Sequence, residues 1–277
     1  MGDPGLFGPD SVTWRVHSDA TMLLGGVRAL LLQALHPLAM AGVAQHSDFR
    51  EDPWGRLFRT ARYVTVTSFG TTLEARQAGL RVRSIHDRLA GVEPESGAAY
   101  RVSDPHLLLW VHCCETDSFL STYRRAGGRV SPADADRYLE EQVSTATLVG
   151  IDPYTVPAST SALRDYFASM QPELRSTAAA RDALRFVLWP PLPTRARPLR
   201  PAWAAVAGTA YALLPRWARR LYGVPALPTT DLAGTLSARA LRSAVRLVPA
   251  HLREAPEVRA ARRRVSGEGG EAVRRGA

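Results

Sequence analysis

The sequence predicts an all-α protein: a single helical domain followed by a basic C-terminal helical extension. Apolar residues recur at helical spacing along most of the chain, between Ser, Thr or Asp caps and Gly or Pro stops. No stretch of useful length alternates apolar and polar residues as a half-buried strand does. With 277 residues, 45% of them hydrophobic, the chain can bury a large core.

The first predicted helix runs from a cap near Ser18 to about Leu35 and is apolar on nearly every face. Such a helix is typical of the centre of a globule. Pro37 either kinks it or begins a second helix that ends near Ala44. Polar residues and this proline interrupt the apolar segment 22–44, so we expect a buried helix pair and no membrane span.

The later helices are predicted from their caps. Asp52-Pro53, Thr71 or Thr72 with Glu74, and Ser131 with Asp134 are each typical helix starts. Residues 93–100 are expected to form a loop. The predicted helices cover residues 53–69, 72–91, 105–125, 132–149, 159–170, 176–189, 200–221 and 230–248.

A proline-rich break at 189–193 suggests the domain organisation. We place the main domain at 14–193 and a C-terminal helical extension, packed on it, at 194–255. The arginine-rich tail, 256–277, is expected to be disordered.

Charge is distributed unevenly. All 35 basic residues are arginine. Residues 195–277 hold 16 arginines against 5 acids, a net charge of +11, whereas residues 1–194 hold 19 against 21, a net charge of −2. The C-terminal part, with an amphipathic segment at 203–221, could meet an anionic membrane surface or be only a solvated face. Nucleic acid is not expected as a partner, because the arginines lack interleaved aromatic residues and any known reader motif.

The cysteines and the N-terminus indicate the compartment. Cys113 and Cys114 are adjacent, and a bridge between neighbours would be strained, so no disulfide framework is expected. The first residues do not have the basic and apolar regions of a signal peptide. We therefore expect a cytoplasmic protein, with a peripheral place at a membrane as the alternative.

Polar residues within apolar helices mark a candidate site. Arg56 and Thr60 are four residues apart, which places them on one face of a helix, flanked by Arg59. A buried guanidinium beside a hydroxyl is costly unless it meets an anionic or accepting group, although an arginine can also reach out to solvent. His36, His86 and His112 either bond neighbouring helices or bind a ligand. Together they could hold one non-haem iron.

Seven motifs and single residues occur along the chain in an order and spacing that can be compared with a protein family. These are GGVRALLLQALHPLAMAGVAQHSDF, DPWGRLFRTARY, Phe69-Gly70, His86, Tyr100, DPHLLLWVH ending at His112, and LVGID at 148–152. Across residues 14–193 the chain resembles the rubber oxygenase catalytic domain family, of the latex-clearing-protein and MpaB type. The resemblance implies a globin-like helical core that holds haem b, with His86 as the axial iron ligand. It also implies that Arg56 and Thr60 lie near the haem. Arg59, which flanks them, and the histidines His36 and His112 are further cofactor-binding candidates.

The implied activity is a haem-dependent oxygenation of a lipophilic small molecule by molecular oxygen. Cleavage of an isoprenoid C=C bond is the reaction that the resemblance suggests. The sequence departs from the family pattern at two positions, which weakens the assignment of C=C cleavage. Arg59 occupies a position where some family members have a lysine ligand. The family is also thought to use an acidic base near the oxygen, but the helix before Arg56 has Met40 and no carboxylate until Asp48. A non-haem iron oxygenase and a non-catalytic haem- or lipid-binding protein remain alternatives. No zinc-protease, CxxC, Walker, dinucleotide-binding or GxSxG motif is present.

Overall fold

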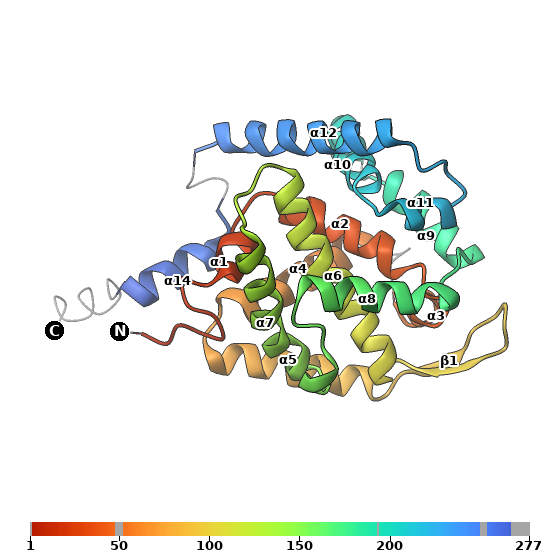
Figure 1. The fold of residues 1–277 in the computed structure, drawn as a ribbon, viewed down its shortest axis with the longest axis horizontal. Coiled ribbons are helices and arrows are strands. Elements are labelled where there is room, and N and C mark those ends of the chain that lie inside the picture. Colours follow the sequence, from red (N-terminus) through yellow and green to blue (C-terminus); the bar gives the residue numbers. More distant parts are fainter. Residues whose placement is uncertain (1, 48–51, 193, 250–253, 267–277) are drawn as a thin grey trace.

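The computed structural model describes residues 2–47, 52–192, 194–249 and 254–266. It confirms the all-α fold class, because helices dominate the described residues and only two short strands occur among them (Figure 1). The α-helices are α1 Val12–His17, α2 Met22–Gln33, α3 Pro37–His46, α4 Pro53–Phe69, α5 Thr72–His86, α6 Pro105–Arg125, α7 Pro132–Leu148, α8 Thr160–Met170, α9 Ala178–Leu188, α10 Arg200–Ala212, α11 Arg216–Leu221, α12 Pro228–Leu247 and α14 Pro256–Ser266. Short 3-10 helices cover Pro153–Thr155, Gln171–Glu173 and Thr194–Leu199.

Local capping chemistry begins the helices where the sequence predicted. The Asp52 carboxylate accepts a hydrogen bond from the Gly55 amide at 2.9 Å. Thr71 with Glu74 and Ser131 with Asp134 form complete capping boxes, each of which satisfies amides that the first helical turn leaves unpaired. These starts were predictable because each cap depends on residues three or four positions apart.

The start of the chain differs from the prediction in its helix boundaries. The expected helix from Ser18 to Leu35 is shorter, since a separate α1 precedes it and α2 begins only at Met22. Pro37 occupies the first turn of α3, so the second of the two alternatives is confirmed. No single helix among the described residues is long and apolar enough to cross a membrane. α2 and α3 pass that test only as a pair, bent by 108°.

Helix α2 lies at the centre of the molecule. It packs along α6 on one side and α10 on another. A side chain in place of Gly25 would approach Phe119 of α6 to 2.9 Å, so a glycine permits this close helix contact. Arg28 is 2% exposed and pairs with Asp117 at 2.7 Å, which fixes α2 against α6.

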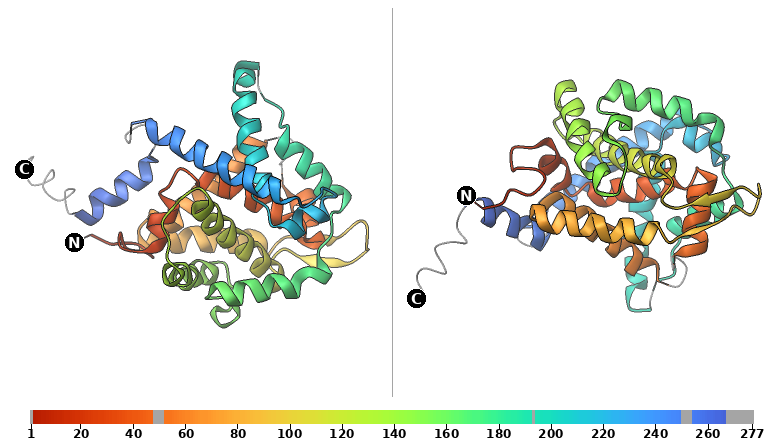
Figure 2. Two further views of the ribbon diagram at one scale, coloured as in Figure 1. Left: turned by 45° about the horizontal axis from the view of Figure 1, so that its top comes forward. Right: turned by 90° about the horizontal axis from the view of Figure 1, so that it is seen from below.

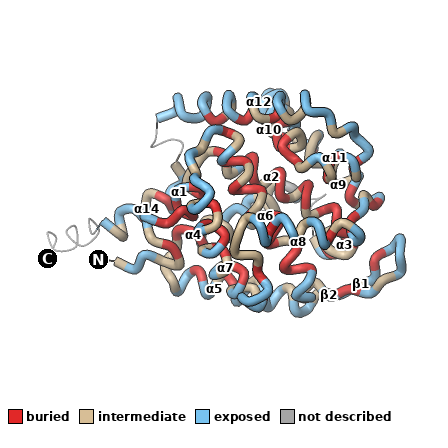
Figure 3. The backbone as a smooth tube through the Cα atoms, in the orientation of Figure 1, coloured by how far each residue is buried: buried red, intermediate tan, exposed pale blue. Residues whose placement is uncertain are grey.

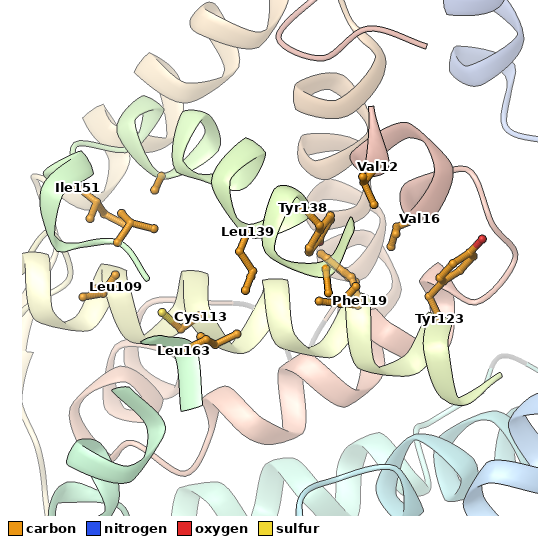
Figure 4. Close-up of a cluster of buried hydrophobic side chains, with 14 of the residues drawn as sticks. Val12, Val16, Leu109, Cys113, Phe119, Tyr123, Tyr138, Leu139, Ile151 and Leu163 are labelled. Atoms are coloured by element: carbon orange, nitrogen blue, oxygen red, sulfur yellow. The ribbon is translucent and has the colours of Figure 1, made fainter. Parts of the chain in front are cut away.

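A second packing layer joins α1, α6, α7 and α8. Its largest cluster of buried side chains includes Val16, Phe119, Tyr138 and Leu139 (Figure 4). The burial colouring shows the same pattern, with buried segments concentrated on the inner helices and exposed segments along α12 and α14 (Figure 3). The interior is therefore continuous across the main domain.

The C-terminal extension is packed on this core. The single helix expected at 200–221 is two helices, α10 and α11, because Pro215 interrupts it. The Asp231 carboxylate of α12 pairs with Arg216 and with Arg219, whose side chain is fully buried. Arg242 of α12 pairs with Asp19 at 2.8 Å. Much of the basic charge here is thus engaged within the fold.

Two local predictions are wrong. The helix expected at 72–91 ends at His86, and strand β1 (Ala90–Val92) follows it. The loop expected at 93–100 is confirmed for residues 93–98, where it joins β1 to its antiparallel partner β2 (Ala99–Arg101). The tail expected to be disordered begins with helix α14, which packs beside the N-terminal segment (Figure 2). The remainder of that predicted tail, 267–277, lies outside the described residues.

Candidate functional site

Helices α1 to α7 all contribute residues to the lining of a cavity of about 470 Å³. Helix α4 contributes a stripe of polar side chains to its wall. Arg56, Thr60, Tyr63 and Thr67 recur every three or four residues, so they share one helix face. The sequence prediction that Arg56 and Thr60 face the same interior space agrees with this geometry.

His86 is the last residue of α5, and its ring lies in the same cavity wall. Its Nδ1 atom is buried and has no hydrogen-bond partner in the part of the chain that the structure describes. Burial lowers the pKa of His86 below its usual value, with only a partial opposing effect from Asp87. The neutral imidazole is therefore the form present at neutral pH, and this is the form that binds metal ions.

Helix α6 contributes His112 and Glu115, which lie three residues apart on the same wall. Burial lowers the pKa of His112 to about 4. Burial raises the pKa of Glu115 to about 7, although Gln33 of α2 donates a hydrogen bond to its carboxylate at 3.3 Å. Glu115 is partly accessible, but it lines the cavity instead of the outer surface. Its carboxyl group is therefore desolvated, which disfavours the charged form and raises its pKa.

Tyr63 of α4 is a further polar residue in the cavity wall. Its hydroxyl is buried, and no described residue forms a hydrogen bond with it. Burial, with a smaller contribution from the Glu115 carboxylate, raises the pKa of Tyr63, so the phenol keeps its proton. A buried hydroxyl without a partner loses its hydrogen bonds to water, and such groups commonly mark a place where a ligand binds.

A smaller apolar pocket of about 140 Å³ adjoins the cavity. Arg56 and Thr60 line both spaces. Its other walls come mostly from α2, α3 and α9, and they include Met40, Leu31, Ala183, Phe186, Val187 and Trp203. The two polar residues of α4 therefore lie where the larger cavity meets the smaller apolar pocket.

The two remaining predicted site residues, Arg59 and His36, do not point to the cavity as the other four do. Arg59 lines the cavity, but its guanidinium pairs with Asp52 at 3.0 Å and is largely exposed. His36 lies outside the cavity, beside Trp110 and His106. The structure thus brings Arg56, Thr60, His86 and His112 together and separates His36 from them. A non-haem iron site built from His36, His86 and His112 is not formed among the described residues.

The sequence analysis missed Glu115, Tyr63 and Gln33. Glu115 had a usable signal, because a carboxylate three residues after His112 interrupts an apolar run in a predicted helix. Tyr63 extends the Arg56–Thr60 face by one turn, so it too could have been found. Nothing near Gln33 indicated that its amide reaches α6.

The protein is thus helical, and its cavity contains a neutral histidine that can bind a metal ion and a glutamate with a pKa of about 7. An apolar pocket adjoins this cavity. The chain belongs to the family described as ER-bound oxygenase mpaB/B′/rubber oxygenase, catalytic domain, whose sequence model matches residues 14–250. The protein is accordingly an oxygenase. The matched region extends past residue 193 and includes α10 to α12. No curated protein and no solved structure matches the chain.

Proposed function

We propose that this oxygenase uses haem b, bound in the 470 Å³ cavity, and oxidises a lipophilic small molecule held in the adjoining apolar pocket. The observation that carries the proposal is His86, a neutral imidazole in the cavity wall with a buried nitrogen that has no partner. The resemblance in sequence and the family membership agree with it.

The residues of the cavity fit a haem. His86 offers a nitrogen ligand to iron, Arg56 offers a cation to a propionate or to bound oxygen, and apolar side chains of α5 and α6 face the same space. Haem supplies the activation of molecular oxygen.

The chain's own groups can perform the accompanying acid–base chemistry. Arg56 stabilises negative charge that develops near it, and the Thr60 hydroxyl donates a hydrogen bond in the same direction. Glu115, with its pKa near 7, can hold or release a proton at neutral pH. It would supply from α6 the carboxylate that the sequence around Met40 lacks.

The apolar pocket supports a lipophilic substrate. Its walls are aliphatic and aromatic apart from Arg56, Thr60 and Gln33. Such a surface binds hydrocarbon by removing apolar area from water. An isoprenoid alkene is the substrate class that the family resemblance favours, and C=C cleavage is the corresponding reaction.

The test is the absorption spectrum of protein purified from a haem-sufficient host. We expect a Soret band and a pyridine haemochromogen of haem b. His86→Ala should lose haem or shift the band strongly, whereas Thr60→Ala should retain haem and lose oxygenation. His106→Ala, a histidine outside the cavity, is the matched control and should leave the spectrum unchanged. A colourless protein that takes up no haemin would refute the haem proposal.

Contact with an anionic membrane is a second proposal, supported by the surface of α12. Leu232, Leu236, Arg239 and Arg246 are exposed and spaced along one helix face. A face of leucines beside arginines is typical of a helix that lies at a lipid surface.

A further inference from the structure

Outside the oxygenase cavity, two histidines and a glutamate converge from three elements. His36 precedes α3, His106 lies in the first turn of α6, and Glu173 ends the 3-10 helix Gln171–Glu173. One ligand atom from each side chain lies within 4.8 Å of the other two. We propose that these three residues bind a divalent transition metal ion, for which zinc is the probe.

His36 is the observation that distinguishes this cluster from an ordinary surface ion pair. The residue is 1% exposed, and neither ring nitrogen has a hydrogen-bond partner among the described residues. A buried polar group without a partner costs free energy and calls for an explanation. A metal ion that replaces the missing partner provides one, because imidazole nitrogen is a favoured zinc ligand.

The distances from the two imidazole nitrogens to the Glu173 carboxylate are near those between ligands of a tetrahedral site. His36 Nε2 lies 3.5 Å from Glu173 Oε2. Ligands about 2.0–2.1 Å from zinc at tetrahedral angles are about 3.3–3.5 Å apart. His106 Nε2 donates a hydrogen bond to the same oxygen at 2.8 Å. That bond would lengthen by roughly half an ångström to admit the ion.

The backbone holds the three ligands in place. The Arg175 amide donates to the Leu35 carbonyl at 2.9 Å, which ties the segment after Glu173 to the residue before His36. Asp104 accepts from the His106 amide and so fixes the first turn of α6. The ligands are therefore preorganised in the absence of the ion.

The charges also favour a cation. Burial lowers the pKa of His36, so its imidazole is neutral. Burial alone would raise the pKa of Glu173, but His106 and His36 hold it below its usual value, so the carboxylate is ionised. The neighbouring Arg175 guanidinium is paired with Glu93 at 2.9 Å. His106 and Glu173 are each about half exposed, so water can reach the fourth position.

The experiment is equilibrium dialysis of the purified full chain against zinc, with zinc per chain measured by elemental mass spectrometry. We expect one zinc per wild-type chain and a rise in Tm on zinc addition. Glu173→Gln and His106→Ala should each weaken binding on the order of tenfold or more, since each removes a direct ligand. These two positions are chosen because replacing buried His36 can disturb folding.

The matched controls are His46→Ala and Glu140→Gln, both at exposed positions outside the cluster, and both should bind zinc as wild type does. Circular dichroism confirms that every variant is folded. Zinc bound equally by all variants, or well below one ion per chain in the wild type, would overturn the proposal. The measurement does not depend on haem, because zinc is counted separately from iron.

Discussion

Glu115 makes a pH-dependent contribution to stability. Its pKa is about 7 in the folded protein against 4.5 for an ordinary glutamate. Between these values the folded state keeps a proton that the unfolded chain releases, so this residue lowers stability as the pH rises from about 4.5 past 7. Glu115→Gln should therefore raise the free energy of unfolding at pH 8, by on the order of 1–3 kcal/mol, and change it little at pH 5.

Urea unfolding at the two pH values measures this effect. Glu140→Gln on the exposed side of α7 removes the same charge without burial, so it should show almost no difference between pH 5 and pH 8. An equal gain for Glu115→Gln at both pH values would show that the side chain is stabilised by packing and not by its proton.

At the scale of single residues, the sequence allowed only part of the site to be predicted. Arg56 and Thr60 share a helix face whatever surrounds them, so their shared direction follows from spacing alone. Whether a histidine faces the cavity depends on contacts between helices far apart in the chain. His36 and His112 looked alike in the sequence, but packing placed His112 in the cavity and His36 against α6 outside it.

At the scale of elements, two glycines in helices should respond oppositely to the same change. A Cβ atom on Gly79 of α5 would lie 2.6 Å from the Cβ and 3.0 Å from the carbonyl oxygen of Leu148 in α7. Gly208 of α10 has nothing within 4 Å of that position. Gly79→Ala should destabilise the protein by about 1–3 kcal/mol through overpacking. Gly208→Ala should stabilise it by about 0.5–1 kcal/mol through helix propensity.

Thermal unfolding of the two variants tests the difference directly. Because α5 carries His86 at its end, Gly79→Ala should also reduce haem retention, whereas Gly208→Ala should leave it unchanged. If both variants were more stable than wild type, the contact between α5 and α7 would be looser than the structure shows.

Helix starts were the most predictable elements, since Asp52, Thr71 and Ser131 act on amides within their own first turns. The hairpin and α14 were missed for the opposite reason. Three-residue strands are too short to show an alternating pattern, and α14 has few apolar residues of its own. Val258 and Ala261 are buried only because Phe7, Trp14 and Phe69 meet them.

At the scale of the whole molecule, the distribution of arginines decides how the membrane proposal should be tested. Arg219 is fully buried and Arg264 donates to the Phe69 carbonyl, so replacing them would disturb the fold. Arg220, Arg246 and Arg263 are exposed. Changing these three to Gln should weaken binding to anionic vesicles roughly 100-fold, since each arginine near the surface adds about 1 kcal/mol.

Co-sedimentation with anionic and neutral liposomes at low and high salt provides the measurement. Salt should weaken wild-type binding, because exposed charges are screened over roughly 8–10 Å. The control replaces Arg76, Arg81 and Arg88, which are exposed in or just after α5, and should bind as wild type does. Equal partition of the wild type onto neutral and anionic lipid would show that the arginines only face solvent.

The contact between α14 and the N-terminal segment has a consequence for biosynthesis. Arg264 donates to the Asp3 carbonyl across 261 positions of the chain, beside the cluster that contains Phe7 and Trp14. Contacts of such long sequence separation form late, because a long loop must close before they are made. Phe7 and Trp14 therefore leave the ribosome well before Val258 and Ala261, which complete their packing, are synthesised. During that interval they are an exposed apolar surface that a chaperone can bind, until α14 is synthesised and covers them.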